Sequence, residues 1–592
     1  MRCNDLLAAR CNLLAYACCV RRLAVFLVLV FAAMCATVPP HHSETPRLED
    51  LSLDEKIGQL FAVRGFGVFM AESSEGYQRL RAAVGRSGVG GVVWFASNVY
   101  ETAQLTRRLQ HEAKVPLLIS ADLEAGLGMR FLDTTFWPPA MAVAATGDPS
   151  LAEAEGRVVA RQARAVGVNH ILAPVADVNV DPDNPVINAR SFGEDPEDVA
   201  RYVAAFVRGV QSQRVLATAK HFPGHGDTHV DSHRAMPIID VTRERLDRVE
   251  LVPFRAAIQA GVKSVMIGHL AVPSLDKTPV PVRAEGHGEN PYGTQPDEVP
   301  SAGTLPATIS HAIVTGLLRH DLGYDGLVVS DAFDMGGITE HFDAGEAAVR
   351  AIEAGEDQIL LSANTDAAIA GVKAAVRSGR LSEARIDQSV RRILEAKAFA
   401  GSAVGDADEI FRQVDTAEDK AVAADVARRA LTLVREEAGA LPLRRDMRVA
   451  LVMVTDGLDL VNPLADFERE LKPAQSFTID HRTQTLPRID ADVIVAAFAI
   501  RARSGAGTIA VPRAARELLE ANRTKRTIGV AFGTPYLLRE VPQLQTYLVA
   551  YGPQPVLQRA VLAALYGEAP ITGKLPVTIP RFYPRGHGIV RR

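Results

Sequence analysis

The chain has 592 residues, more than the ~100–200 residues of one typical domain, so we expect two domains. Hydrophobic residues make up 47% of the chain and charged residues 23%, the balance of a globular protein that buries a large core. The net charge of −5 argues against a nucleic-acid-binding protein, which needs a basic surface to displace counterions from phosphates.

The amino-terminal segment, residues 1–38, is predicted to be a signal peptide or a membrane anchor. Arg21 and Arg22 precede an apolar run of 16 residues, which is short for a membrane span and typical of a secretory signal. We therefore expect export to the periplasm or the medium, with membrane contact only through this segment. Two alternatives stay open, namely an uncleaved anchor helix and a lipid on Cys35.

Cysteine usage agrees with an exported protein. All five cysteines lie within the first 35 residues. The rest of the chain therefore has no disulfide, no thiol nucleophile and no zinc–thiolate site. A body without cysteines suits an oxidising compartment, and we expect packing alone to stabilise it.

Residues 49–400 alternate between short β-rich runs and amphipathic helical stretches such as 151–167 and 313–320. Eight runs are predicted strands: 58–66, 90–95, 116–122, 170–178, 215–220, 264–269, 326–331 and 358–362. Eight strand–helix units over this length predict a catalytic (β/α)8 barrel of the TIM type.

A second, smaller domain is predicted after the barrel. Residues 401–446 are predicted to be a linker and helices, and residues 447–592 an α/β sandwich domain with a mostly parallel sheet. Its predicted strands are 448–454, 492–499, 527–533 and 546–552. No glycine-rich phosphate loop follows these strands, so we expect neither a nucleotide nor another cofactor.

Polar groups stand at the ends of five predicted barrel strands: Asp122, Asp177, Lys220 with His221, His269 and Asp331. The chemistry of a (β/α)8 barrel takes place at the carboxyl ends of its strands. A single aspartate there often only caps the next helix. Five such groups around one barrel mouth predict an active site.

The segment after the fifth strand, KHFPGHGDTHVDSH (220–233), contains four histidines. Their spacing would suggest a metal site on a helix, but Pro223, Gly224 and Gly226 make a helix improbable, so we predict no metal. In an extended loop, Asp231 and His233 face the same side. The carboxylate favours the protonated imidazole, which makes His233 a candidate proton donor. The alternative is a surface loop in which both residues cap turns.

Asp331 ends the buried run at residues 326–329 and is the candidate nucleophile. A carboxylate at the end of a buried strand is costly unless it is hydrogen-bonded or used in chemistry. Asp334 is expected to cap the helix that follows. A carboxylate nucleophile and a proton donor are the two catalytic groups that a retaining glycosidase needs.

These motifs resemble the family 3 glycoside hydrolases. The resemblance covers residues 49–400, and the carboxyl-terminal domain resembles the second domain of that family. It rests on KHFPGHGDTHVDSH (220–233), NPVINARSFGEDP (184–196), MIGHLAVPSLD (266–276), LPATIS (305–310), LGYDGLVVSDAFDM (322–335) and AIEAGEDQILL (351–361). The Asp-Ser-His ending of the first motif resembles the β-N-acetylglucosaminidase branch.

The resemblance implies a retaining mechanism with Asp331 as the nucleophile, His233 as the general acid/base and Asp231 as its partner. It also implies four residues that bind the terminal sugar: Asp122, Arg190, Lys220 and His221. The chain departs from the family where Leu127 replaces an arginine, although Arg130 follows three residues later.

The long loop 280–306 is expected to affect the choice of leaving group. Arg501 and Arg503 of the second domain are candidates to reach the barrel mouth. The alternative is a second domain that only packs against the barrel.

The leading functional hypothesis is an exo-acting β-N-acetylglucosaminidase for peptidoglycan fragments or chitin oligosaccharides. Two further hypotheses assume the same site. One is a glycoside phosphorylase, in which phosphate replaces water as the acceptor, and the other is a β-glucosidase or β-xylosidase. A carbohydrate-binding protein on an inactive barrel and a metal-dependent hydrolase are the remaining alternatives. The expected partner is a carbohydrate, not a nucleic acid, and a monomer is favoured.

Overall fold

The computed structural model describes residues 45–228, 230, 232, 236–281, 303–458, 461–501 and 509–592. The predicted signal or anchor segment, with Cys35, lies outside these residues, as does most of the loop 280–306. Residues Thr45–Arg592 belong to one unit, which contains both sheets.

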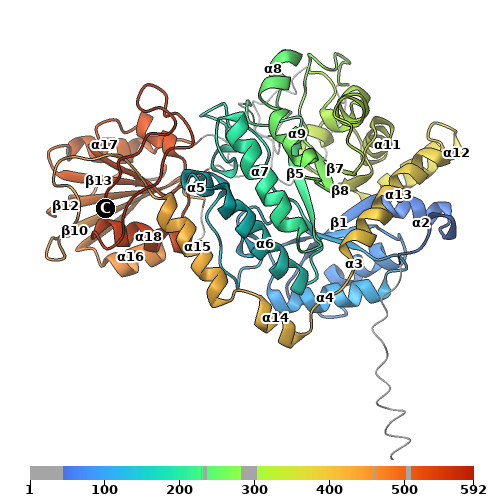
Figure 1. The fold of residues 1–592 in the computed structure, drawn as a ribbon, viewed down its shortest axis with the longest axis horizontal. Coiled ribbons are helices and arrows are strands. Elements are labelled where there is room, and N and C mark those ends of the chain that lie inside the picture. Colours follow the sequence, from blue (N-terminus) through green and yellow to red (C-terminus); the bar gives the residue numbers. More distant parts are fainter. Residues whose placement is uncertain are drawn as a thin grey trace, which may run out of the picture. The chain divides into compact units, whose positions relative to one another are not determined.

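Eight parallel strands close into a barrel in chain order, with β8 paired to β1. The strands are β1 (Phe61–Phe66), β2 (Gly91–Phe95), β3 (Leu118–Ala121), β4 (His170–Ile171), β5 (Leu216–Phe222), β6 (Ser264–Ile267), β7 (Leu327–Ala332) and β8 (Gln358–Leu360). Figure 1 shows the barrel strands among the helices that surround them. The predicted (β/α)8 barrel is confirmed.

The fourth strand is much shorter than the predicted run 170–178. Pro174 has no N–H to donate to a ladder, and beyond Ile171 the pairing with β5 continues only as an isolated bridge between Val175 and Lys220.

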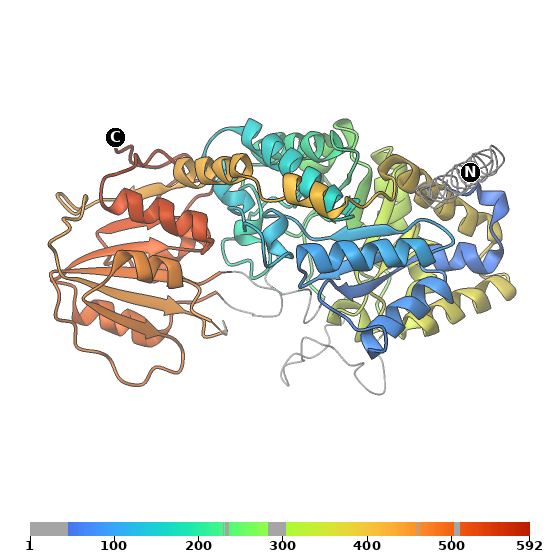
Figure 2. The same ribbon diagram turned by 90° about the horizontal axis from the view of Figure 1, so that it is seen from below.

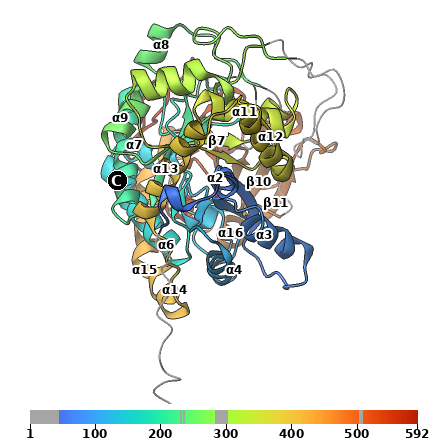
Figure 3. The ribbon, with the colours of Figure 1, turned by 90° about the vertical axis from the view of Figure 1, so that its right-hand side faces the viewer.

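Twelve α-helices precede the second sheet in the barrel region that the structure describes. They are α2 (Leu53–Gln59), α3 (Glu75–Gly85), α4 (Val99–Glu112), α5 (Ala140–Ala145), α6 (Pro149–Ala165), α7 (Pro196–Gln211), α8 (Arg243–Arg248), α9 (Val252–Gln259), α10 (Gly336–Thr339), α11 (Ala344–Ala354), α12 (Thr365–Arg377) and α13 (Glu383–Ala400). Shorter elements are η1 (Leu48–Asp50), η2 (Leu127–Met129), η3 (Asn188–Arg190), η4 (Ala307–Ile309) and the π-helical η5 (Ala312–Asp321). Figure 3 shows α2 beside α12 and α13, which it contacts.

Local sequence explains where the two long helices α6 and α7 begin. Asp148 and Asp195 each accept a hydrogen bond from a backbone N–H of the first turn, and a proline occupies the first helical position. An aspartate cap satisfies a donor that the helix leaves open, and proline at this position lacks only an N–H that would have no partner. The two helices pack against each other on the outside of the barrel.

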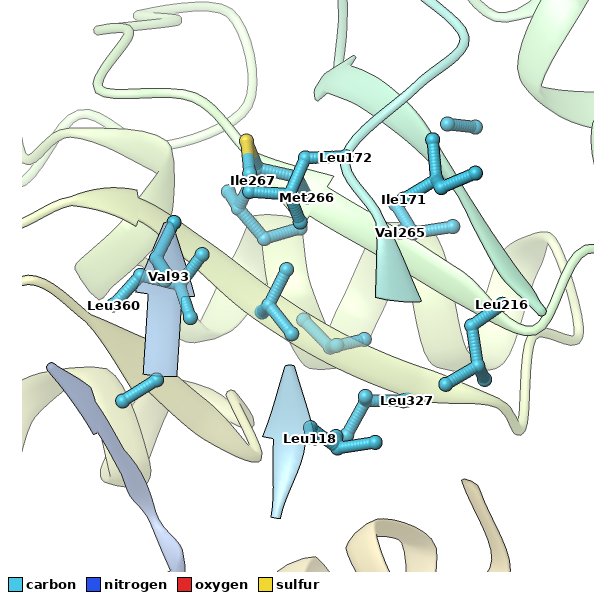
Figure 4. Packing of buried hydrophobic residues seen from close by; sticks show 14 of the residues in the cluster. Val93, Leu118, Ile171, Leu172, Leu216, Val265, Met266, Ile267, Leu327 and Leu360 are labelled. Atoms are coloured by element: carbon cyan, nitrogen blue, oxygen red, sulfur yellow. The ribbon is translucent and has the colours of Figure 1, made fainter. Parts of the chain in front are cut away.

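Large apolar side chains fill the interior of the barrel. Leu118, Leu216, Val265 and Leu327 are almost completely buried, and Figure 4 shows them converging from different strands. A barrel of eight strands is filled by such layers and leaves no channel. Substrate can therefore enter only from the mouth of the barrel.

The second sheet has the strand order β11-β10-β12-β13-β14-β9 and is parallel except for β9. Its strands are β9 (Thr432–Arg435), β10 (Val449–Thr455), β11 (Gln475–Ile479), β12 (Val493–Ala499), β13 (Arg526–Ala531) and β14 (Thr546–Val549). The helices are α14 (Ala407–Gln413), α15 (Ala417–Ala430), α16 (Ala465–Leu471), α17 (Arg513–Ala521) and α18 (Pro555–Leu565), with the 3-10 element η6 (Pro535–Arg539). Helices cover both faces of this sheet (Figure 2).

The predicted second α/β domain with a mostly parallel sheet is confirmed. Two edge strands carry too little signal to be predicted. β9 lies within the segment assigned to the linker and helices and has only four residues, and β11 alternates between exposed and partly buried positions. Among the residues that the structure describes, no helix combines the length and apolar character needed to cross a bilayer.

Candidate active site at the carboxyl end of the barrel

A cleft of about 580 Å³ opens at the carboxyl ends of the barrel strands. Five of the sequence-predicted site residues line it: Asp122, Lys220, His221 and Asp331 from the ends of three strands, and Arg190 from η3. Closure of the barrel brings these side chains together, although they are spread over more than 200 residues of the chain. The position agrees with the place where (β/α)8 barrels carry out chemistry.

Lys220 is the centre of a buried ionic network. Its Nζ lies 2.8 Å from Asp122 Oδ1 and 2.7 Å from Glu124 Oε1, and its side chain is only 2% exposed. Arg190 binds Glu124 through two hydrogen bonds of 2.8 Å, and Arg130 binds the other oxygen of Asp122. Three cations thus surround two carboxylates on one wall of the cleft.

The charges in this network fix the protonation state of its carboxylates. Burial alone would raise the pKa of Asp122, but the charges of Lys220 and Arg130 outweigh it and hold that pKa well below its ordinary value. The pKa of Glu124 is likewise held low against burial, by Arg190 and Lys220. Both side chains are therefore ionised acceptors, suited to the hydroxyl groups of a sugar.

Asp177 lies behind the cleft wall, fully buried, and orients a histidine that lines it. Its Oδ2 is 2.8 Å from His221 Nδ1, and its Oδ1 accepts the backbone N–H groups of His221 and His225. A carboxylate on Nδ1 fixes the imidazole orientation, so that Nε2 is the atom left for a ligand. Asp177 is a positioning residue and does not itself line the cleft.

His225 also lines the cleft but contacts its own loop. Its Nδ1 is 2.8 Å from Thr228 Oγ1, and its Nε2 is 3.0 Å from Ser232 Oγ. Burial, chiefly, lowers the pKa of His225 to about 4, so it is neutral at pH 7. Both of its ring nitrogens are used to hold the loop after β5.

A glycine allows this loop to pack closely against the chain that follows β4. A Cβ atom at Gly226 would lie 1.7 Å from the carbonyl oxygen of Val178. Only a residue without a side chain fits there. The glycines that made a helix improbable at this place therefore serve a close approach of two loops.

Asp331 lies in β7 and lines the same cleft as Asp122 and Lys220. The backbone N–H of Ala332 donates to its Oδ1 at 2.8 Å. His269 stands behind it, with Nε2 2.9 Å from the carbonyl oxygen of Ala332. His269 is fully buried and supports the end of β7 without lining the cleft, unlike the prediction from its place at a strand end.

The expectation that Asp334 caps the next helix is wrong. The cap position of α10 is Met335, and Asp334 instead pairs with Arg64 of β1, Nη2 to Oδ2 at 2.8 Å. Arg64 lines the cleft, and its guanidinium lies over the ring of Phe95 at 4.9 Å. Only β8 separates β7 from β1, and Asp334 pairs with Arg64 rather than with the helix end because a buried carboxylate gains more from a cation than from one N–H.

The predicted acid/base pair, Asp231 and His233, lies outside the described residues. Ser232, between them in sequence, is buried and lines the cleft, where His225 contacts its hydroxyl.

The second domain contributes to the cleft as well. Arg501, Tyr551 and Gln554 line it, whereas Arg503 falls outside the described part of the chain. Further contacts join the two domains, such as Asn179 Nδ2 to the Tyr536 hydroxyl at 3.0 Å. The second domain therefore does more than pack against the barrel.

Sequence reasoning missed Glu124 and Arg64 as cleft residues. Glu124 follows Asp122 by two residues, a signal that could have found it, because alternate residues of an extended segment face the same side. No local signal marks Arg64, since its partner Asp334 lies far along the chain.

Comparison with known proteins agrees with this architecture. Residues 52–396 match the family described as Glycosyl hydrolase family 3 N terminal domain. A relative from Cellulomonas fimi, named beta-N-acetylglucosaminidase/beta-glucosidase, is 32% identical over 567 residues, which are 90% of this chain and 94% of that protein. The chain belongs to glycosyl hydrolase family 3. The predicted family resemblance is thus confirmed.

Two solved structures extend the similarity to both domains of this family 3 chain. A glycoside hydrolase family 3 beta-N-acetylglucosaminidase from Paenibacillus sp. str. FPU-7 has a TM-score of 0.74 and 32% identity, and covers 89% of this chain and 99% of its own. The beta-glucoside phosphorylase BglX bound to 2FGlc has a TM-score of 0.79 and 26% identity, and covers 90% and 95%.

Proposed function

We propose that the protein is a retaining exo-β-N-acetylglucosaminidase that releases terminal N-acetylglucosamine from peptidoglycan fragments or chitin oligosaccharides. One observation carries the proposal: Asp331 shares a cleft, closed at its base by the packed barrel, with the ionic network around Lys220. The network suits the hydroxyls of one terminal sugar. The similarity to the Cellulomonas fimi relative over nearly the whole chain supports the same conclusion.

In the proposed first step, Asp331 attacks the anomeric carbon while the bond to the leaving oxygen breaks. His233, supported by Asp231, gives its proton to that oxygen. In the second step the neutral imidazole takes a proton from water, whose oxygen attacks the same carbon and releases Asp331. The hydrogen bond from the Ala332 N–H to Asp331 Oδ1 supports a fixed orientation of the attacking carboxylate.

Asp122, Arg190, Lys220 and His221 are proposed to bind the terminal sugar. The ionised carboxylate of Asp122 accepts hydroxyl hydrogen bonds, and His221, oriented by Asp177, presents its Nε2. Arg190 lines the cleft, is held by Glu124 and acts as a hydrogen-bond donor to the sugar. In this proposal these four residues bind the sugar, and only Asp331 and His233 take part in bond making and proton transfer.

The test of the nucleophile is labelling with a 5-fluoro analogue of N-acetylglucosamine that carries an activated leaving group, followed by peptide mass spectrometry. We expect the label on Asp331, and a loss of at least about 1,000-fold in kcat for Asp331→Asn. Asp325→Asn is the matched control, because Asp325 precedes the same strand and its side chain is 90% exposed. A label on another residue, or full activity of Asp331→Asn, contradicts the proposal.

Phosphorolysis is the second candidate, favoured by the similarity to the beta-glucoside phosphorylase over both domains. A histidine acid/base also fits it, since an imidazole that has lost its proton carries no charge to repel phosphate. Aryl β-glycosides with and without the 2-acetamido group, each assayed with and without phosphate, separate the candidates. A sugar 1-phosphate product identifies the phosphorylase, and preference for the sugar without acetamide identifies a glucosidase or xylosidase.

We further propose that the protein is exported and acts as a monomer on its carbohydrate substrate. The basic and apolar pattern of residues 1–38 supports export. Mass spectrometry of the mature amino terminus distinguishes cleavage, a retained anchor and a lipid on Cys35.

A further inference from the structure

Three loops at the barrel mouth are joined into one ledge, which we define as residues 66–69, 95–100 and 130–132. The N–H of Gly67 donates to the carbonyl of Phe95, and the N–H of Ser97 donates to the carbonyl of Arg130 at 2.7 Å. The N–H of Leu132 donates to the carbonyl of Ser97 at 2.9 Å. The loops after β1, β2 and β3 therefore hold one another in place.

The ledge exposes apolar side chains to an unusual degree. Of the twelve large apolar side chains that are exposed in the described part of the chain, five belong to it: Phe66, Val68, Phe69, Tyr100 and Leu132. Phe69 is 81% exposed and Leu132 is 72% exposed. Single exposed apolar residues are ordinary, but a group of them beside a cleft marks a binding surface.

The ledge begins where the cleft ends. Arg64, Phe95 and Arg130 line the cleft, and both guanidiniums lie over the Phe95 ring, at 4.9 and 4.8 Å. Phe66 is the register partner of Phe95 and follows Arg64 by two residues, so it lies on the same side of β1 as Arg64. An aromatic path thus leads from Phe95 in the cleft to Phe66 on the rim.

We propose that the ledge binds the second and third sugar units of a β-linked chain of N-acetylated sugars whose terminal unit lies in the cleft. This inference rests on the proposed function. The C–H faces and acetamido methyl groups of such sugars are apolar, and aromatic side chains offer them large, rigid surfaces. Arg130 is the only charged residue of the ledge, and it is held by Asp122, so an uncharged chain fits better than an acidic one.

The test compares chain lengths, because a disaccharide has no third sugar unit to place on the ledge. The readout is the ratio of kcat/KM for the chitin tetrasaccharide to kcat/KM for the disaccharide. We expect a wild-type ratio well above one and a decrease of about fivefold in Phe69→Ala, the middle of the range for an aromatic contact. Phe69→Tyr keeps the ring and should restore the ratio. Phe411→Ala is the control, since Phe411 is 80% exposed on α14, outside the ledge.

The outcomes separate the ledge from the proposed function. A wild-type protein that does not cleave the disaccharide contradicts the proposed function itself. Cleavage of the disaccharide with a wild-type ratio near one, or with a Phe69→Ala ratio within twofold of wild type, overturns the ledge alone. A change of sedimentation coefficient in Phe69→Ala would also overturn it, by assigning the surface to contact with a second copy of the chain.

Discussion

The ionic network around Lys220 permits a quantitative prediction for the cleft. Lys220 lies 2.8 Å from Asp122, and the two side chains are only 2% and 16% exposed. At that distance the attraction is about 6 kcal/mol with an effective dielectric constant of about 20, before desolvation is subtracted. We expect Lys220→Met to lower the free energy of unfolding by about 3–5 kcal/mol, because it leaves two buried carboxylates with fewer cations.

A double-mutant cycle isolates the pair. Asp122→Asn leaves Lys220 with Glu124, and the double variant removes the pair altogether. We expect a coupling energy of about 2–4 kcal/mol from urea midpoints of the four proteins. The exposed pair Lys114–Glu55, at 3.0 Å, is the control, and its coupling should stay below about 1 kcal/mol. Additive effects at Lys220 and Asp122, within about 0.5 kcal/mol, would refute the electrostatic account of the cleft wall.

Three other substitutions test buried groups. Burial raises the pKa of Glu356 well above 4.5, so the folded protein keeps this proton and the free energy of unfolding of wild type falls as pH rises above 4.5. Relative to wild type, the free energy of unfolding of Glu356→Gln should therefore increase by up to about 1.4 kcal/mol for each pH unit, measured by urea titration. The control is Glu395→Gln at an exposed position, which should show no such increase. Burial lowers the pKa of Lys397 from 10.5 to about 7, so the free energy of unfolding of wild type rises with pH between 7 and 10, by up to about 1.4 kcal/mol for each pH unit. Lys397→Met should lose this pH dependence. The same dependence of stability on pH in Lys397→Met would contradict the shift. Gly226→Ala places a Cβ 1.7 Å from a carbonyl oxygen. It should lower the free energy of unfolding by about 1–3 kcal/mol and remove most of kcat/KM. Gly316→Ala is the control and should be tolerated, because its Cβ meets nothing closer than 3.8 Å.

The motifs that carry chemistry were readable from the sequence because each is local. Asp331 lies near the end of one buried strand, and Lys220 and His221 lie near the end of another. The topology rule for barrels then places all strand ends at one mouth. For Asp122, Lys220, His221 and Asp331, this reasoning was enough to predict a common cleft, whereas Arg190 was expected only from the family resemblance.

The sequence could not tell which strand-end groups face that cleft. Asp177 and His269 occupy the same kind of position as Lys220, yet both stand behind the cleft wall and hold its members in place. The difference depends on strand length and on the path of the following loop. β4 ends after two residues, so Asp177 belongs to the loop beyond it, where it accepts the backbone N–H of His221, near the end of β5, and that of His225, in the loop after β5.

Local patterns of apolar residues, prolines and capping aspartates determined the barrel, the second α/β domain and the list of reactive side chains. Tertiary structure alone decided the pairs: Lys220 with Asp122, which are 98 residues apart, Arg64 with Asp334, and the loops that join into the ledge. The physical reason is that hydrogen-bonded periodicity depends on near neighbours, whereas the partner of a buried charge is fixed only when closure of the barrel brings distant strand ends within bonding distance.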